Sequence, residues 1–341
     1  MGWSSVKTRR HFSIFAIAVL AYNVPVILWG AYVRISFSGD GCGANWPFCN
    51  GQVIPQHMAT PMAIEFTHRA MTSLDTFAVL AMVVWAFLAF PKQHAVRKYS
   101  VLSLIFLFVE ALLGAGLVLF RLVARDQSAG RAWYLSAHLT NTLLLLAALT
   151  ATAWLAYSNS ERLRWSNASR QMLVALAITV VVSITGAIAA LGDTLFPASS
   201  LAAGIRQDLS STTGMLLRLR VLHPAVAILG AAYLMWVAAS ALKFAGHALP
   251  LRAAAKRVIA AVGLQIAAGV VNIALLAPVW MQLIHLFIAD LVWITIVLMT
   301  LESIRATSSR NFQNGIGQTR SLPKTGSATP VASGASDSLS M

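Results

Sequence analysis

Eight long apolar segments dominate this chain and restrict it to folds that cross a membrane. As α-helices rising 1.5 Å per residue, all eight are long enough to cross about 30 Å of hydrocarbon. Only 11% of the residues are charged, compared with about 25% in a soluble domain. The sequence therefore predicts an all-α integral membrane protein with eight transmembrane helices. They are expected near residues 12–34, 66–90, 99–121, 131–157, 170–191, 216–243, 255–277 and 280–303.

The positive charges predict the orientation of the chain. Every lysine and most of the arginines lie at the N-terminus, in alternate loops or in the C-terminal tail. Positive residues are enriched on the cytoplasmic side, so both termini are predicted to be cytoplasmic. The basic residues are dispersed among short loops, and for this reason we predict no nucleic-acid partner despite the net charge of +14. The first apolar segment is too long for a signal peptide and is expected to remain as a helix.

The two halves of the chain resemble each other at an offset of about 155 residues. Small residues are common in membrane helices, so each match alone is weak. Several matches at nearly one offset predict two four-helix halves of the same orientation, residues 1–160 and 161–305. The matching positions are His68 with His223, Glu110-Ala-Leu-Leu-Gly114 with Gln265-Ile-Ala-Ala-Gly269, and Gly30-Ala31 with Gly186-Ala187.

The last part of the chain, residues 306–341, differs in composition from the rest. It is rich in Ser, Thr, Gly and Pro and has no apolar period. Such a segment cannot bury enough apolar surface to compensate for the entropy lost on ordering. We predict a disordered cytoplasmic tail.

Four histidines lie within every second apolar segment: His68, His138, His223 and His285. All four segments run from outside to inside, and each histidine is expected within about the first two turns. One membrane histidine alone is well explained by an interhelical hydrogen bond. Polar groups in the bilayer are costly, however, and favour a functional interpretation. Four histidines at one depth, two in each half, predict a cofactor site in each half.

Bis-histidine haem is the cofactor that this pattern favours. Imidazoles from facing helices can hold a planar metal cofactor from both sides within a bundle. Zinc is less consistent with ligands spread over four helices, with no HExxH motif and no close Cys/His cluster. Gly114, Gly116 and Gly269 could leave room for a porphyrin face, or could serve only close helix packing.

Both cysteines, Cys42 and Cys49, lie in the outer loop between the first two helices. The redox environment outside the cytoplasmic membrane favours a disulfide between them. Closing so short a loop stabilises the fold by roughly 2–3 kcal/mol in the chain-entropy model. A purely structural role and a redox or regulatory role are both open at this point.

Glu65 precedes His68 by three residues, so the two side chains share one face of a helix. If His68 faces a haem pocket, Glu65 lies beside it and could move a proton or stabilise positive charge on a substrate. The alternative is an acidic residue that is favoured in the first turn by the helix dipole. The histidine pattern favours the functional interpretation.

Other charged residues are candidates for supporting roles. The membrane acids Asp75, Glu110 and Asp290 could be partners of histidines or could pair with arginines. Arginines near the outer helix ends could bind haem propionates or could only anchor the helices at the interface. These arginines are Arg121, Arg125, Arg131, Arg218 and Arg220.

Over residues 12–303 the sequence resembles the haem A synthase family. The most specific motifs are GDGCG at 39–43, WPFCNG at 46–51 and EFTHR at 65–69. The single histidines His138, His223 and His285 complete the pattern, and Cys42 and Cys49 match the family's outer-loop pair.

The resemblance implies an oxidoreductase of the bacterial cytoplasmic membrane that acts in assembly of terminal oxidases. Its members oxidise a methyl group of haem O to a formyl group by successive hydroxylations, with Glu65 matching the catalytic carboxylate. The haem O-producing farnesyltransferase is an expected partner. The resemblance places the iron of haem O between His68 and His138, and that of haem B between His223 and His285.

Two other functions are compatible with part of this pattern. A cytochrome b-like electron carrier would hold permanent haems at both histidine pairs, but it has no evident need for Glu65. A secondary transporter built on parallel repeats would explain the duplication and the membrane acids. It would not explain four histidines at one depth.

Overall fold

The computed structural model describes residues 3–161, 163, 170–210, 214–246 and 248–320. All elements named in this part of the chain are α-helices, and eight of them are long and apolar enough to cross a membrane, as predicted. The additional helix α6 is short and was not predicted. The helices are α1 (Trp3–Ile35), α2 (Thr60–Ala89), α3 (Ala95–Leu119), α4 (Ala129–Ser158), α5 (Arg170–Leu195), α6 (Leu201–Leu209), α7 (Met215–Ala245), α8 (Leu249–Ala274) and α9 (Val279–Arg320).

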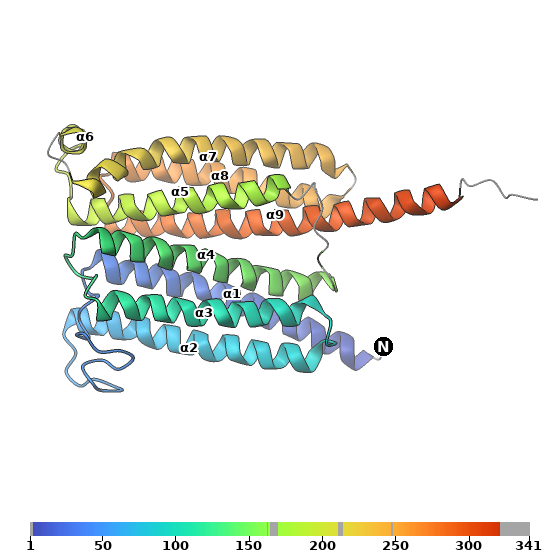
Figure 1. The fold of residues 1–341 in the computed structure, drawn as a ribbon, viewed down its shortest axis with the longest axis horizontal. Helices are drawn as coiled ribbons and strands as arrows, with labels where there is room; N and C mark the ends of the chain where they lie inside the picture. Colours follow the sequence, from blue (N-terminus) through green and yellow to red (C-terminus); the bar gives the residue numbers. More distant parts are fainter. Residues whose placement is uncertain (1–2, 162, 164–169, 211–213, 247, 321–341) are drawn as a thin grey trace, which may run out of the picture.

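The long helices form two groups of four that lie side by side (Figure 1). In the first group α1 packs on α2, α2 on α3, α3 on α4, and α4 returns to α1. The same cyclic order recurs in α5, α7, α8 and α9. The start of α1 and the end of α9 lie at the same end of the bundle (Figure 1). That this end is cytoplasmic stays a prediction from the charges.

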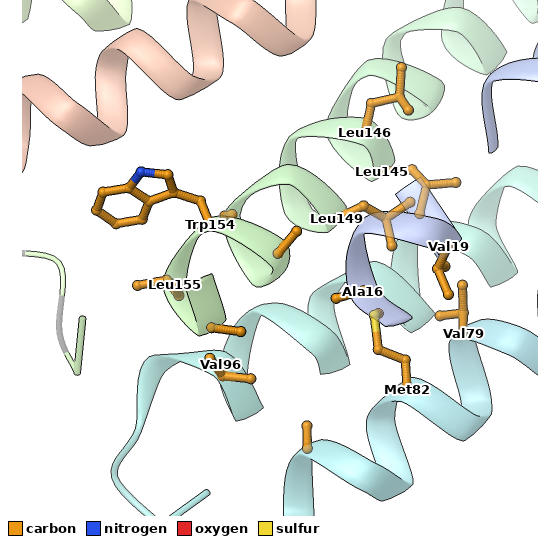
Figure 2. Packing of buried hydrophobic residues seen from close by; sticks show 14 of the residues in the cluster. Ala16, Val19, Val79, Met82, Val96, Leu145, Leu146, Leu149, Trp154 and Leu155 are labelled. Atoms are coloured by element: carbon orange, nitrogen blue, oxygen red, sulfur yellow. The ribbon is translucent and has the colours of Figure 1, made fainter. Parts of the chain in front are cut away.

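Helix α4 is the central element of the molecule. It contacts α1 and α3 in its own group and α5 and α9 in the other group. Because partners surround it, most side chains between Asn141 and Ala156 are buried. Figure 2 shows part of this core, in which Leu145 and Leu149 of α4 face Val19 of α1 and Val79 and Met82 of α2, whereas Trp154 points away from these helices.

Two tryptophans fasten α4 to α9 by hydrogen bonds. The indole Nε1 of Trp293 donates to the carbonyl oxygen of Leu143 at 2.7 Å. Near the other end, Nε1 of Trp154 donates to Oε1 of Glu302, also at 2.7 Å. Each bond satisfies an indole that burial would otherwise leave without a partner.

Helix α9 extends further than the sequence predicted. It continues to Arg320, so the prediction of disorder from residue 306 is wrong for residues 306–320. The first residues of this extension, up to Ser308, belong to the apolar span that is long enough to cross a membrane. The hydroxyls of Thr307 and Ser308 also bond to carbonyls one turn earlier. The rest of the predicted tail, residues 321–341, lies outside the described residues.

Asp75 pairs with an asparagine rather than with a histidine or an arginine. Nδ2 of Asn23 in α1 donates to Oδ1 of Asp75 in α2 at 2.9 Å. Both side chains are buried. The pair connects two helices of the first group by a polar contact in an apolar environment, where an unsatisfied group is expensive.

We expect Asn23→Leu to destabilise the protein by about 1–3 kcal/mol, because Asp75 is left buried without its amide partner. The double variant Asn23→Leu/Asp75→Leu should recover part of this loss, because both polar groups are then absent. Thermal unfolding in detergent checks the order of the two variants. Equal melting temperatures for Asn23→Leu and the parent would contradict the assignment.

Candidate functional site

The four membrane histidines lie at similar distances from the starts of their helices. His68 follows Thr60 by eight residues, and the other three lie six to nine residues into α4, α7 and α9. At 1.5 Å per residue this places all four about 9–14 Å inside the helix starts. His285 therefore lies within the first two turns of its helix, as expected, at 3.6 residues per turn. The other three lie slightly deeper, because α2, α4 and α7 begin earlier than expected.

Each histidine ring packs against a glycine of a neighbouring helix. A Cβ added to Gly30 or to Gly186 would lie 2.9 Å from Cε1 of the opposing ring, and one added to Gly269 would lie 3.2 Å away. At Gly114 the distance is 3.9 Å, an ordinary contact. The four pairs are His68 with Gly30, His138 with Gly114, His223 with Gly186 and His285 with Gly269.

The glycines therefore serve the histidines directly. Three of the four imidazoles occupy space that any larger residue would need. Gly116, expected to leave room for a porphyrin, instead lies against the ring of Tyr134. The repeat of Gly30 at Gly186 was visible in the sequence, but nothing there connected these glycines to the histidines.

His68 and His138 lie in the first helix group, and His223 and His285 lie in the second. That each pair binds one cofactor stays a prediction. Nδ1 of His68, Nδ1 of His138 and Nδ1 of His285 are buried without a hydrogen-bond partner among the described residues. Buried ring nitrogens without partners are suited to coordination.

The donor set fits a planar cofactor with two axial ligands. The described residues contain no cluster of three or more His, Cys, Asp or Glu side chains that could hold a metal ion. A zinc site normally needs three or four such ligands. One pair of imidazoles in each helix group instead matches bis-histidine haem, in which the porphyrin supplies the remaining ligands.

Glu65 is buried and is held by the outer loop. The backbone N–H of Cys42 donates to Oε2 of Glu65 at 2.8 Å, and Nη2 of Arg69 donates to Oε1 at 2.5 Å. Nη1 of Arg69 donates to the carbonyl oxygens of Asn45 and Phe48 at 2.8 and 2.9 Å. Glu65, Arg69 and the loop between α1 and α2 are thus joined by hydrogen bonds. Glu65 lies about one helical turn before His68 in α2.

The disulfide between Cys42 and Cys49 is present, as predicted. Both cysteines are buried, and the N–H of Asn50 donates to the carbonyl oxygen of Cys42. The disulfide closes the part of the loop that touches Glu65. Sequence reasoning placed the loop and the acid close together in the chain, but it missed the bonds that join them and the role of Arg69.

The second helix group has a different arrangement at the position equivalent to Glu65. Arg220 occupies it, and its Nε donates to Oδ1 of Asp208 at 2.9 Å. Nη1 of Arg220 lies 3.3 Å from Oδ1 of Asp193. Arg220 therefore fastens α6 to the start of α7, and among the described residues no carboxylate lies one turn before His223.

Hydrogen bonds hold Arg220 and Arg131, two of the arginines considered for propionate binding. Arg220 makes the bonds just described, and buried Arg131 donates to the carbonyl oxygens of Ala124 and Asp126 at 2.8 and 2.9 Å. The side chains of the other three, Arg121, Arg125 and Arg218, are exposed, and that of Arg125 stacks on Phe37. A role in binding propionates stays a prediction for all five.

The remaining membrane acids differ in their surroundings. Glu110 in α3 lies against His138, with its Oε1 at 3.2 Å from Nδ1 of the ring. Asp290 in α9 is buried, and its Oδ2 has no hydrogen-bond partner. Of the three acids left unassigned by the sequence, Glu110 alone is placed beside a histidine by a direct contact.

Comparison with known proteins identifies relatives over most of the chain. The family model described as cytochrome oxidase assembly protein (COX15-CtaA) matches residues 13–297. Proteins of two Thermus thermophilus strains, both named protoheme IX farnesyltransferase, are 41% identical to it over 305 residues. The match covers 87% of this chain and 49% of each relative, so the chain spans about half their length.

Shorter matches link the chain to proteins named heme A synthase. The protein of Exiguobacterium sibiricum is 33% identical over 112 residues, which cover 33% of this chain and 38% of the relative. The protein of Lysinibacillus sphaericus is 35% identical over 115 residues, covering 34% and 38% respectively.

We expect Gly30→Ala to displace the ring of His68 and to weaken haem binding in the first helix group by about tenfold, the lower range for a change beside a metal ligand. Gly186→Ala should do the same to His223 in the second group. The matched control is Gly263→Ala in α8, where an added Cβ meets nothing within 4 Å. Haem titration followed by absorbance measures the effect, and equal affinities for the Gly30 and Gly263 variants would contradict it.

Proposed function

The chain belongs to the haem A synthase family of cytochrome oxidase assembly proteins, and from this premise we propose that it converts haem O into haem A for terminal oxidases. One methyl group of the porphyrin becomes a formyl group by successive hydroxylations. With water as the oxygen donor, each hydroxylation replaces one C–H bond of the methyl carbon by a C–OH bond and releases two electrons and two protons. The electrons would pass to a two-electron acceptor outside this chain. The hydrated aldehyde formed by the second step then loses water.

The first helix group is the proposed substrate site. His68 and His138 would bind the iron of haem O from opposite faces and so fix the position of its methyl groups. This role is supported by the place of both histidines in one helix group and by the glycine that each ring packs against. Holding the substrate in one orientation lets the same methyl carbon be oxidised twice.

Glu65 is the proposed catalytic carboxylate, and its position carries the whole assignment. It lies one helical turn from His68 in the first group, where the second group has Arg220. Cys42 and Arg69 hold both carboxylate oxygens, so the group does not have to reorient during the reaction. We propose that Glu65 accepts or stabilises the proton released as the methyl group is oxidised.

The second helix group is the proposed site of a resident haem B, bound by His223 and His285. When bound, this group would take up and pass on one electron at a time. Arg220 and α6 would cover the outer end of the site and restrict access of water to it. The absence of an acid equivalent to Glu65 is consistent with a haem that is not modified.

The proposed substrate must come from an enzyme that farnesylates protohaem. The Thermus relatives are named protoheme IX farnesyltransferase and are about twice as long as the region that matches this chain. We propose that a farnesyltransferase of the same bacterial cytoplasmic membrane supplies haem O to this protein. Transfer within the membrane suits a farnesylated porphyrin because its tail is apolar.

A cytochrome b-like carrier remains the second candidate, because two histidine pairs could hold two permanent haems. It would not require a buried carboxylate clamped beside only one of the pairs. The product of the reaction distinguishes the two functions, since a carrier leaves the porphyrin methyl group unchanged.

We expect Glu65→Gln to reduce haem A formation by roughly a hundredfold or more, because the variant cannot accept a proton. Haems extracted from cells that also produce haem O can be separated and identified by mass. Glu302→Gln is a suitable control, because Glu302 bonds to Trp154 at the opposite end of the bundle. Unchanged haem A with Glu65→Gln would overturn the catalytic assignment.

The two-site proposal also predicts different consequences for the two histidine pairs. His223→Ala and His285→Ala should lose the haem that copurifies with the protein, because each removes an axial ligand. His68→Ala and His138→Ala should retain that haem and lose conversion of haem O. Absorbance spectra of purified variants, with haem analysis of the cells, check both results, and equal haem loss in all four would refute the division.

A further inference from the structure

We propose that Glu110 is a positioning residue for His138, which orients the ring and strengthens it as an iron ligand in the first helix group. The inference rests on the proposed function, because it presumes that His138 binds the iron of a haem. It assigns Glu110 a role distinct from that of Glu65. It also accounts for a chemical difference between the two helix groups.

Glu110 is held by one face of α4. Nδ2 of Asn141 donates to Oε2 of Glu110 at 2.5 Å, and the hydroxyl of Thr142 donates to Oε1. Nδ1 of His138 lies 3.2 Å from the same Oε1 but does not form a hydrogen bond with it in this ring position. The three α4 residues are spaced i, i+3 and i+4, so they share one helix face.

This geometry favours one tautomer of the ring. The Asn141 and Thr142 donors fix the carboxylate, and a small rotation of the ring would direct Nδ1–H at Oε1. Nε2 of His138 would then carry the lone pair and be available for coordination. A carboxylate on the other ring nitrogen raises the basicity of a ligating histidine.

His138 needs such a partner more than the other three histidines do. An added Cβ on Gly114 would meet its ring at 3.9 Å, whereas at the other three glycines the closest distance is 2.9–3.2 Å. The glycine contact therefore constrains His138 least. The carboxylate of Glu110 supplies the missing constraint from another direction.

The second helix group keeps a polar side chain beside its histidine but has neither the acid nor its two donors. Gln265 stands at the position of Glu110, and its Nε2 lies 3.2 Å from Nε2 of His285. Ile288 and Ala289 stand where Asn141 and Thr142 hold the acid, at three and four residues after the histidine. The acid and both of its donors have changed together. This is the pattern expected if the three form one functional unit.

An anionic partner makes imidazole a stronger donor, which stabilises ferric more than ferrous iron. In Glu110→Gln we expect the affinity for haem in the first group to fall by roughly tenfold. At a fixed potential the ferric-to-ferrous ratio of that haem should also fall about tenfold, equivalent to about 59 mV for a one-electron couple.

The test uses haem B as the probe in a His223→Ala/His285→Ala background, so that the signal arises from the first group alone. Haem titration gives the affinity, spectroelectrochemistry gives the potential, and low-temperature electron paramagnetic resonance reports the strength of the axial ligands. Glu110→Asp should restore part of the potential, because it keeps the charge. A merely structural role would change the melting temperature without moving the potential.

A transplant provides the reciprocal arm. Gln265→Glu/Ile288→Asn/Ala289→Thr, in a His68→Ala/His138→Ala background, should lower the potential of the haem in the second group. This arm decides the matter if Glu110→Gln does not fold.

The outcomes separate the two proposals. Bound haem with an unchanged potential in Glu110→Gln, or no shift in the transplant, would overturn the role of Glu110 and leave the proposed function intact. A parent protein that binds no haem in the first group would overturn both.

Discussion

Contact between a histidine ring and a glycine backbone, repeated in all four histidine-bearing helices, is the constraint on which the arrangement depends. At three of the four histidines the ring occupies space that a side chain on the facing helix would need. The approach is closest at Gly30 and Gly186. The contact therefore determines which helices are neighbours and how deep each imidazole lies. It serves both helix groups, although their surroundings differ.

Differences between the groups arise around this common frame. In the first group the outer loop reaches Glu65 through Cys42, and Arg69 ties the acid to the loop. In the second group Arg220 occupies the equivalent position and binds α6 instead. The two similar helix groups are thus covered at this end by different segments, the loop between α1 and α2 in the first group and α6 in the second. One presents a carboxylate beside a histidine and the other does not.

The sequence was sufficient for the number of membrane helices, because hydropathy reflects a strong, local constraint. The pairing of the histidines about a cofactor stays a prediction. The sequence did not predict side-chain contacts between residues that are far apart in the chain. The glycine opposite His68 is nearly forty residues away, and the pairing of Asp75 with Asn23 depends on how α1 and α2 pack. Composition also misled at the end of α9, where residues 306–320 extend an existing helix although their sequence is polar.

The burial of α4 has a consequence for how the protein is made. This helix leaves the ribosome before α5 and α9, the partners that later cover it, and its polar side chains must first face lipid. The hydroxyls of Ser136, Thr140 and Thr152 already bond to carbonyls of α4 itself, four residues earlier. The helix can therefore remain in the bilayer before α5 and α9 are inserted, because these three hydroxyl donors are already satisfied. Assembly of the second half then adds the bonds from Trp293 and Glu302 without rearranging the first.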